Sequence, residues 1–273
     1  MSISVISACK NRTHALSISL ASWILFDEID EIIITDWSSD IPVKDLTKLS
    51  KKIKVITVEN QKYFNQPQPL NLAASISKGD SILKLDSDTI LNPYYNFFDH
   101  YKVGENDFIT GYYSGNFTFY KHLWGTLFLT RNNFNKIGGY NEHMGDYVAW
   151  EDTEIVERLE VLGLEHRTID HLQNHAISLP HGAKERIENF KAYHENTALT
   201  NRIRNKLIEE NGEELADKVL HRALLETHNI INSKAYKVKF KTRKSKYYVE
   251  PMIKWNITQI DDQNFLAEKT TNK

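Results

Sequence analysis

The chain has 273 residues, of which 41% are hydrophobic and 26% are charged, and its formal net charge is −2 at pH 7. This composition is typical of a soluble globular protein and is enough for one large domain or one domain with an appendage. The charge indicates no overall affinity for nucleic acid. The single cysteine, Cys9, excludes an internal disulfide and most thiolate metal sites.

The N-terminal stretch MSISVISACK has neither the basic region nor the long apolar region of a signal peptide. No segment approaches the roughly 18 apolar residues that a membrane-spanning helix requires. We therefore expect a cytoplasmic protein whose membrane contact, if it has one, is peripheral and at the inner face.

In the first half of the chain, strand-like apolar runs alternate with segments of helical spacing. The expected strands are 3–8, 31–36, 52–58 and 81–85, and the expected helices are 14–26, 43–51 and a segment that opens at Pro69. This alternation predicts an α/β protein with a parallel sheet. In such sheets ligands bind at the carboxyl ends of the strands, which is where Asp36, Asp86 and Asp88 are expected.

The pattern changes after residue 105. Three strand-like segments, DFITGYY, FTFYKH and GTLFLTR, lie close together without a long helix between them, which predicts a mixed sheet. Residues 151–162 predict a helix with acids in its first turn. From about residue 185 the chain is polar with helical spacing. We therefore expect a main domain at 1–190 and a helical C-terminal extension with a basic arm at 191–273.

Asp86 and Asp88 follow the apolar run SILKL with one serine between them. A solvated turn is the simplest interpretation of such a pair, but its place at the binding edge of a parallel sheet favours a hard divalent cation, Mn²⁺ or Mg²⁺. Such an ion would let a nucleotide diphosphate approach the carboxylates. A haloacid-dehalogenase-like phosphatase is a second interpretation, although Thr89 directly follows the pair and Ile90 stands where that pattern has threonine.

Four segments in order, ISVISACKNR, EIIITDWSSD, QPLNLAASISKGD and ILKLDSDT, resemble glycosyltransferases of the GT-A fold, close to the family 2 type. The resemblance implies a Rossmann-like mixed sheet flanked by helices, a nucleotide-diphospho-sugar donor, and a metal and diphosphate site at Asp86 and Asp88. It also implies contacts to the donor nucleotide, which we assign to five residues: Arg12, Asp36, Asp40, Asn71 and Asp86. The alternatives are a solvated loop cation for Arg12 and turn residues for Asp36 and Asp40.

Residues 124–159 resemble the acceptor-side segment of β-1,4-galactosyltransferases and of bacterial chondroitin-type polymerases, through Gly-Gly-Tyr-Asn at 138–141 and Trp150, Glu151 and Asp152. The segment departs from that family at YVAW, where glycines often adjoin the tryptophan. We assign Asp152 as the base for the acceptor hydroxyl, and Glu151 as an acceptor ligand or as the base in its place. A helix N-terminus enriched in acids is the alternative. Trp150 and Trp124 are candidates to stack on a sugar ring or to lie in the core.

The segment SLPHGAKERIENF resembles the part of this family that supplies a metal-binding histidine, which maps to His181. Galactosyltransferases have a methionine ligand three residues earlier, where this chain has Ser178. The resemblance therefore implies a metal shell of Asp86, Asp88 and His181 that differs from theirs, and an ordinary loop histidine is the alternative.

Residues 234–246, KAYKVKFKTRKSK, contain seven basic residues and no acid. This basic arm is a candidate for contact with an anionic membrane that presents a lipid-linked acceptor; a solvated strand, or an arm that packs on a second copy in a homo-oligomer, is the simpler interpretation.

Together these features predict a metal-dependent, inverting glycosyltransferase. It would move a hexose or N-acetylhexosamine, with galactose or N-acetylgalactosamine favoured, from a UDP-sugar to a glycan or lipid-linked acceptor in surface-polysaccharide synthesis. The alternative is a nucleotide- or carbohydrate-binding protein that has this fold without catalysis.

Overall fold

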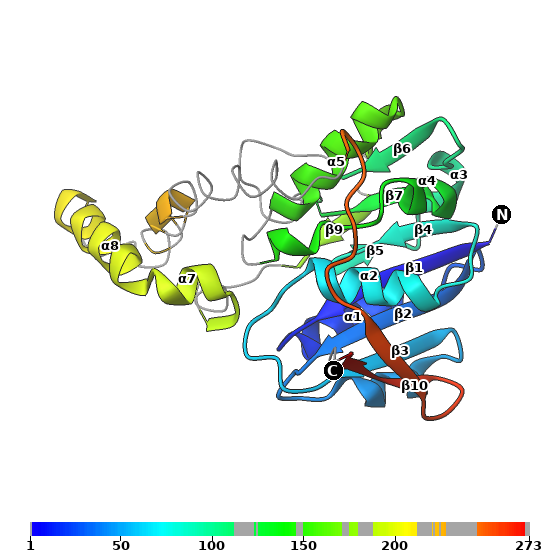
Figure 1. Ribbon diagram of the computed structural model, residues 1–273, viewed down its shortest axis with the longest axis horizontal. Coiled ribbons are helices and arrows are strands. Elements are labelled where there is room, and N and C mark those ends of the chain that lie inside the picture. Colours follow the sequence, from blue (N-terminus) through cyan, green and yellow to red (C-terminus); the bar gives the residue numbers. More distant parts are fainter. Residues whose placement is uncertain are drawn as a thin grey trace.

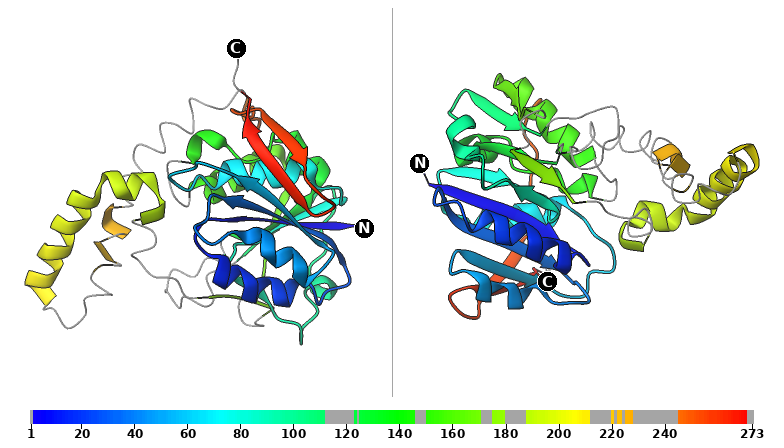
Figure 2. Two further views of the ribbon diagram at one scale, coloured as in Figure 1. Left: turned by 90° about the horizontal axis from the view of Figure 1, so that it is seen from below. Right: turned by 180° about the vertical axis from the view of Figure 1, so that it is seen from behind.

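The computed structural model describes residues 2–111, 123, 125–145, 150–170, 175–179, 188–211, 220, 222–223, 225–227 and 245–270. A large mixed β-sheet forms its centre (Figure 1). Helices lie on both sides of this sheet, as the two further views show (Figure 2). The architecture is the mixed α/β fold that the sequence predicts.

Nine strands of the described residues form the main sheet, in the order β10-β11-β3-β2-β1-β4-β7-β6-β8. Their bounds are β1 Ile3–Cys9, β2 Ile29–Trp37, β3 Ile53–Val58, β4 Ser81–Lys84, β6 Asp107–Thr110, β7 Leu127–Thr130, β8 Glu165–Thr168, β10 Trp255–Gln259 and β11 Asn264–Lys269. A small second sheet pairs β5 (Thr89–Leu91) with β9 (Ala176–Ser178). Strand β7 runs antiparallel to β4 and β6, so the sheet is mixed as expected. The expected strand FTFYKH lies outside the described residues.

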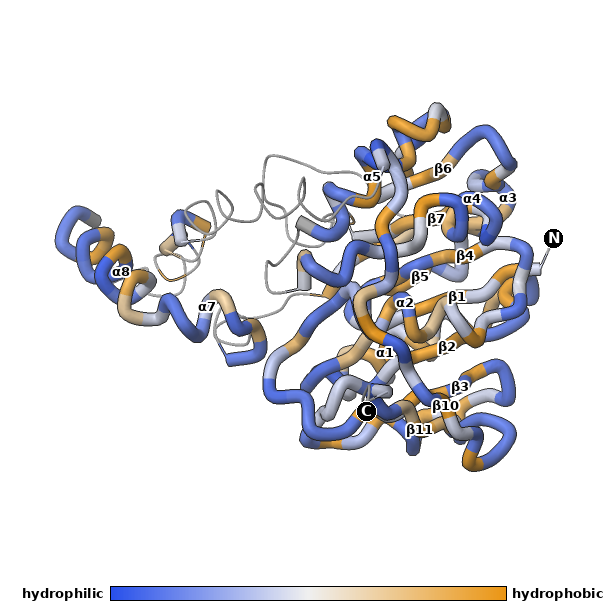
Figure 3. Tube along the Cα trace, in the orientation of Figure 1, coloured by the Kyte–Doolittle hydropathy of each residue, from blue (hydrophilic) through white to orange (hydrophobic). Residues whose placement is uncertain are grey.

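Helices close a separate apolar core on each face of the sheet. Helix α1 (Thr13–Trp23), the 3-10 helix η1 (Val43–Leu49) and α3 (Phe97–His100) contribute to one core. The other core takes side chains from α2 (Pro67–Ile76), α4 (Arg131–Lys136) and α5 (Trp150–Leu162). Hydrophobic residues are concentrated in the strands and the helix faces against them (Figure 3). Among the helices of the described residues, none combines the length and the apolar character needed to cross a membrane.

The parallel strands bring the expected site residues to one edge of the sheet. Cys9, the last residue of β1, is paired with Asp36 near the end of β2. On the other side of β1, Ile6 is paired with Lys84, the last residue of β4. Asp86 and Asp88 follow β4 directly, so they lie at the carboxyl edge together with Asp36. The sequence predicted this arrangement because the apolar runs of β1, β2 and β4 are short and continuous, as in strands that are buried on both faces.

The C-terminal region is only partly helical. Helices α7 (Lys191–Glu195) and α8 (Thr197–Asn211) agree with the expected extension, and Figure 1 shows α8 projecting away from the sheet. By contrast, β10 and β11 form a hairpin, and β11 adds to the main sheet in parallel with β3. A fully helical extension was therefore the wrong expectation for 255–269. The hairpin is held by tertiary contacts, with the ring of Trp255 5.7 Å from that of Trp37 in an edge-on arrangement.

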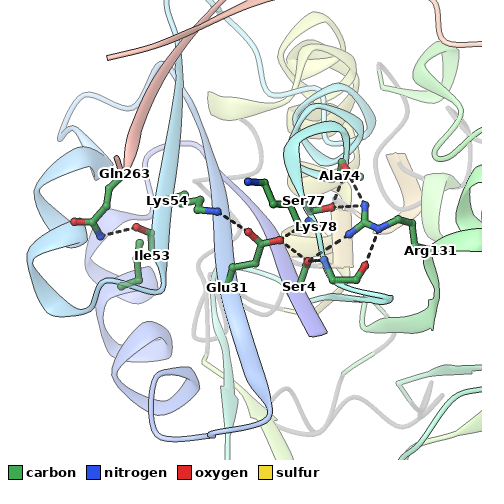
Figure 4. Close-up of polar contacts among 10 residues, drawn as sticks. Ser4, Glu31, Ile53, Lys54, Ala74, Ser77, Lys78, Arg131 and Gln263 are labelled. Carbon is green, nitrogen blue, oxygen red and sulfur yellow. Dashed lines mark hydrogen bonds and ion pairs between the residues drawn. The ribbon is translucent and has the colours of Figure 1, made fainter. Parts of the chain in front are cut away.

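Polar side chains tie the chain together at the opposite, amino edge of the sheet (Figure 4). Glu31 accepts hydrogen bonds from the hydroxyl of Ser4 at 2.7 Å and from the ammonium of Lys54 at 2.6 Å. Arg131 donates to the carbonyl of Gly79 at 2.6 Å. The side-chain amide of Gln263 donates to the carbonyl of Ile53 at 2.7 Å and fixes the start of β11 beside β3. This edge therefore stabilises the fold on the side away from the expected site.

Candidate active site

The Asp86–Asp88 pair is held between the main sheet and the small sheet. Strand β4 ends at Lys84 and β5 begins directly after Asp88. The backbone N–H of Leu179 donates to the carbonyl of Asp88 at 2.7 Å, next to the pairing of β5 with β9. The segment that leads toward His181 therefore starts beside Asp88, while His181 itself lies outside the described residues.

Each carboxylate of the pair has a cationic partner. Nη1 of Arg12 lies 2.7 Å from Oδ2 of Asp88, whose side chain is 6% exposed. Nζ of Lys84 lies 2.8 Å from Oδ1 of Asp86, and the amide of Gln66 donates to the same oxygen at 3.2 Å. These partners offset the repulsion between two neighbouring carboxylates.

Lys84 also connects the pair to the first turn of α5. Its side chain is 1% exposed, and its Nζ lies 3.3 Å from Oδ1 of Asp152. Burial lowers the pKa of Lys84, but the charges of Asp152 and Asp86 outweigh burial, and the pKa lies well above its ordinary value. The side chain is therefore an ammonium that lies between two carboxylates from separate elements of the fold.

The two acids at the start of α5 are buried and differ in their titration. Burial raises the pKa of Asp152 to about 6, with the charge of Lys84 acting against burial and that of Asp86 adding to it. Burial, followed by the charge of Asp152, raises the pKa of Glu151 well above its ordinary value. A pKa of about 6 leaves Asp152 largely ionised at neutral pH. Trp150 is the first residue of α5, and its side chain lies outside the described part of the structure.

The Gly-Gly-Tyr-Asn segment forms a turn against α2. Gly138 has a φ of 76° and Gly139 a φ of 72°, a region that other residues rarely adopt. The amide of Asn71 donates to the carbonyl of Tyr140 at 2.8 Å and to Glu142 at 3.0 Å, and its oxygen accepts from the N–H of Tyr140 at 2.8 Å. The side chain of Asn71, assigned from sequence to the nucleotide, is thus engaged with the acceptor-side turn, and its nucleotide contact stays a prediction.

The loop after β2 is shaped by Asp36. Its two carboxylate oxygens accept from the N–H groups of Ser39 and Val43, each at 3.0 Å. Asp40 is exposed, and its own N–H donates to the side chain of Asn11 at 2.8 Å. Both acids thus lie at the carboxyl edge, where Asp36 orders the loop, and their contact with a base or ribose stays a prediction.

Lys10 joins three segments at this edge and was not singled out from the sequence. Its Nζ donates to the carbonyls of Trp37 at 3.3 Å, Ser38 at 3.2 Å and Gln61 at 2.8 Å. Burial lowers the pKa of Lys10, and Asp40 and Asp36 offset part of that effect. The contacts fix the ends of β1 and β2 to the loop before α2.

Sequence reasoning also missed Lys84, Gln66 and Gly125. A Cβ added at Gly125 would lie 2.0 Å from Oδ2 of Asp86 and 2.9 Å from Nζ of Lys84, so a larger residue would displace the side chains of the ion pair. The sequence did contain one signal for Lys84, namely a lysine within the apolar run SILKL. A strand that is covered on both faces gives a charged side chain no access to water.

A cavity of about 400 Å³ lies beside the site, behind the loop that carries Gln66. It is lined by aromatic rings, side-chain amides, cationic groups, one carboxylate and one methionine: Trp37, Gln61, Lys62, Tyr63, Phe64, Asn65, Gln68, Glu142, His143, Lys191, Met252 and Lys269. Asn65 lines the cavity, while the next residue, Gln66, donates to Asp86. The cavity and the carboxylates are thus separated by one short loop.

Within the described ranges, no three His, Cys, Asp or Glu side chains are grouped as a metal-binding cluster. The donor set at the end of β4 nevertheless suits a hard divalent cation, since it offers carboxylate oxygens. Trp124, His181 and nearly all of the basic arm lie outside the described residues, and their roles stay predictions.

No protein-family model and no curated protein matches this sequence. Among solved structures, the 1–349 fragment of S. aureus TarS matches with a TM-score of 0.51 and 14% identity over 90% of this chain and 76% of that chain. The same fragment in complex with UDP matches with a TM-score of 0.51 and 15% identity over 97% of this chain and 96% of that chain. A mannosyltransferase, PcManGT from Pyrobaculum calidifontis in complex with GDP-Man and Mn²⁺, has a TM-score of 0.48 and 13% identity over 88% of this chain and 73% of that chain. The likeness to TarS shows a shared fold: this chain, like that fragment, is a mixed α/β structure with a large mixed sheet flanked by helices.

Proposed function

We propose that this protein is a glycosyltransferase that moves a hexose or N-acetylhexosamine from a UDP-sugar to a hydroxyl of a glycan or lipid-linked acceptor. The observation that carries the proposal is the contact of one buried ammonium, Lys84, with Asp86 at the donor edge and Asp152 at the start of α5. Two carboxylates for which we propose separate tasks thus contact one ammonium. The fold, shared with a protein that has been solved with UDP, supports the same conclusion.

The donor half of the proposed site is the carboxyl edge of β1, β2 and β4. Asp86 and Asp88 would hold Mn²⁺ or Mg²⁺, with His181 as a further ligand, and Arg12 would contact the diphosphate or remain on Asp88. The ion would neutralise the leaving diphosphate when it is bound. Asp36, Asp40 and Asn71 are proposed contacts for the base and ribose.

The acceptor half is the start of α5. A base must be deprotonated at the working pH and lie within hydrogen-bond reach of the attacking hydroxyl. Asp152 meets the first condition, because its pKa of about 6 leaves it largely ionised at neutral pH. Burial and the charge of Asp152 raise the pKa of Glu151 well above its ordinary value, and we propose Asp152 as the base and Glu151 as an acceptor ligand. We propose attack on the face opposite the diphosphate, and therefore inversion, with Trp150 stacked on a sugar.

The cavity behind the Gln66 loop is our candidate for the rest of the acceptor. Aromatic faces and side-chain amides are the groups that bind the C–H face and the hydroxyls of a sugar. Tyr63 and Phe64 supply rings and Asn65 an amide, next to the loop that reaches Asp86. The cavity is also large enough for a small ligand, about 400 Å³.

The remaining proposals follow from the sequence. We propose a catalytic domain at 1–190, a C-terminal part at 191–273, a cytoplasmic location, and peripheral membrane contact or self-association through the basic arm. Galactose and N-acetylgalactosamine stay the favoured sugars, because the acceptor-side segment resembles β-1,4-galactosyltransferases and chondroitin-type polymerases.

A screen of UDP-sugars for UDP release with Mn²⁺, with and without a panel of saccharide acceptors, tests the proposal. We expect slow hydrolysis of one donor and faster release with a suitable acceptor. UDP binding without turnover of any donor would instead support a binding protein with this fold. Release of phosphate from an aryl phosphate, without UDP binding, would support a phosphatase.

A further inference from the structure

Lys84 is a buried cation for which the proposed reaction has no assigned role. It is the last residue of β4, and its backbone is paired with Ile6 of β1 and Leu127 of β7. The side chain is 1% exposed in the middle of the main sheet. A charge at such a place is strongly disfavoured unless carboxylates compensate it. A lysine at this buried position therefore indicates that carboxylates lie around its ammonium.

The two compensating carboxylates come from separate parts of the chain. Asp86 lies 2.8 Å from the ammonium and Asp152 lies 3.3 Å from it. Asp86 is further restrained by the amide of Gln66, at 3.2 Å. A single ammonium thus contacts carboxylates from both the end of β4 and the first turn of α5.

Gly125 gives independent evidence that the groups around the Lys84–Asp86 pair are closely packed. Any side chain at this position would collide with the Asp86 carboxylate and crowd the Lys84 ammonium, at 2.0 Å and 2.9 Å from its Cβ. The backbone before β7 therefore approaches the ion pair closely, and a side chain at residue 125 would require Asp86 or Lys84 to move.

We propose that Lys84 is a positioning residue for sugar transfer, whose ammonium holds the donor-side Asp86 and the acceptor-side Asp152 at a fixed separation. The inference rests on the proposed function. Transfer requires the acceptor oxygen and the donor carbon to meet at close distance, and a displacement of about 1 Å costs about 100-fold in rate. Lys84 therefore acts on the reaction through the two carboxylates and not by touching a substrate.

The alternative is an ion pair that serves only the fold, and Lys54, whose side chain is 22% exposed against 1% for Lys84, is the control for it. Lys54 pairs with the buried Glu31 at 2.6 Å on the opposite edge of the sheet (Figure 4). Lys54→Met and Lys84→Met make the same chemical change, which removes the charge and keeps a side chain of similar length. Only Lys84→Met changes a residue of the proposed site.

The test is a pair of double-mutant cycles with two readouts. Transfer kcat is measured for wild type, Lys84→Met, Asp152→Asn and the double variant, and the Kd for UDP is measured for the corresponding set with Asp86→Asn. We expect Lys84→Met to lower kcat by about 100-fold with the acceptor KM changed less than about threefold. The double variant should be slower than Asp152→Asn by less than about fivefold, because a residue that acts through Asp152 adds little once Asp152 is replaced.

In the donor cycle, the loss of UDP affinity in Lys84→Met should likewise overlap with that of Asp86→Asn. Losses that multiply in both cycles would overturn the proposal, and so would a folded Lys84→Met with normal kcat. Lys54→Met should keep kcat within about twofold of wild type. An equal loss in Lys54→Met would assign the effect to the fold and would also overturn the proposal.

If Lys84→Met does not fold, Lys84→Gln keeps a hydrogen-bond donor without the charge and carries the same expectations. Gly125→Ala then tests the geometry with the ammonium in place, and its loss of UDP affinity should overlap with that of Asp86→Asn. A wild-type protein that neither binds UDP nor transfers sugar would remove the proposed function and this inference with it. A wild-type protein that transfers, with Lys84→Gln and Gly125→Ala equally active, would remove this inference alone.

Discussion

The guanidinium of Arg12 lies 2.7 Å from the carboxylate of Asp88 and so joins the turn before α1 to the end of β4. Because the Asp88 side chain is 6% exposed, this pair is screened by salt much less than a surface pair. A cation or a phosphate that reaches Asp88 must therefore share or replace this contact. Among the described residues, the Asp88 carboxylate is thus paired with a protein cation before any substrate arrives.

The first prediction concerns Asp88. Asp88→Asn keeps the shape of the side chain and removes its charge, so we expect the Mn²⁺-dependent part of UDP affinity to fall by at least about tenfold. Calorimetric titration of UDP with and without Mn²⁺ measures this. Asp45→Asn is the control, since Asp45 forms an exposed pair with Lys48 away from the site. A metal-dependent affinity equal to that of wild type would show that Asp88 is not a ligand.

The second prediction is the pH dependence of transfer. The proposed base must be ionised, and burial raises the pKa of Asp152 to about 6. Transfer kcat should therefore rise about tenfold per pH unit below this pKa and level off above it. Rates measured from about pH 5 to about pH 8 at saturating substrates test this. A profile that is flat across this range would contradict the assignment of Asp152.

The third prediction concerns stability. The pKa of Asp152 is raised from 3.8 in the unfolded chain to about 6 in the folded protein. The folded state therefore binds more protons between these values, and its stability falls as the pH rises through this window. Asp152→Asn removes this cost above the window while slowing transfer strongly. The variant also loses one of the two carboxylates that compensate Lys84, so the expectation concerns the change with pH: its free energy of unfolding relative to wild type should be higher at about pH 7 than at about pH 4.

Urea unfolding of both proteins at the two pH values measures this difference. A variant that is less stable than wild type by the same amount at both pH values would show that the carboxylate is not strained in the folded state.

The fourth prediction concerns Asn71, whose amide makes three hydrogen bonds that hold the Gly-Gly-Tyr-Asn turn on α2. Asn71→Ala leaves buried partners unsatisfied and should cost about 2–4 kcal/mol in the free energy of unfolding. Asn132→Ala removes an exposed amide and should cost less than about 0.5 kcal/mol. A UDP affinity that falls without loss of stability would instead assign Asn71 to the nucleotide.

The fifth prediction concerns the cavity. Tyr63 lines it, with a ring centroid 5.4 Å from that of His194 on α7. If the cavity holds the acceptor, Tyr63→Ala should raise the acceptor KM by about tenfold and leave the Kd for UDP within about twofold. Tyr94→Ala, at a ring that is 92% exposed, is the control. Equal acceptor kinetics for the Tyr63 and Tyr94 variants would exclude the cavity as the acceptor site.

The sequence was sufficient for the strands that position the site. β1, β2, β3 and β4 are short apolar runs, and the structure places all four within a few residues of their predicted bounds. α2 begins at Pro67, two residues before the predicted Pro69, because both prolines fit the first helical turn. Local patterns predict such elements well, because their signal is contained in neighbouring residues.

The remaining features depend on contacts between distant residues. Lys84 and Asp152 are 68 positions apart, and nothing in SILKL indicates which carboxylate will meet the lysine. The C-terminal hairpin was missed for a related reason: β10 and β11 are half exposed, so their apolar period is weak. Their pairing with β3 and the contact of Trp255 with Trp37 decide their structure.

The central claim is that the carboxyl edge of β4 binds a nucleotide diphosphate through Asp88 while Asp152 faces the sugar. A crystal structure with UDP and Mn²⁺, with the metal located by its anomalous scattering, tests this most directly. We expect an anomalous peak for a metal ion that is coordinated by Asp88 and the diphosphate. The uracil should lie beside β1 and β2, and Asp152 should lie across the sugar position from the phosphates. An ordered UDP elsewhere on the molecule, with no metal at Asp88, would contradict it.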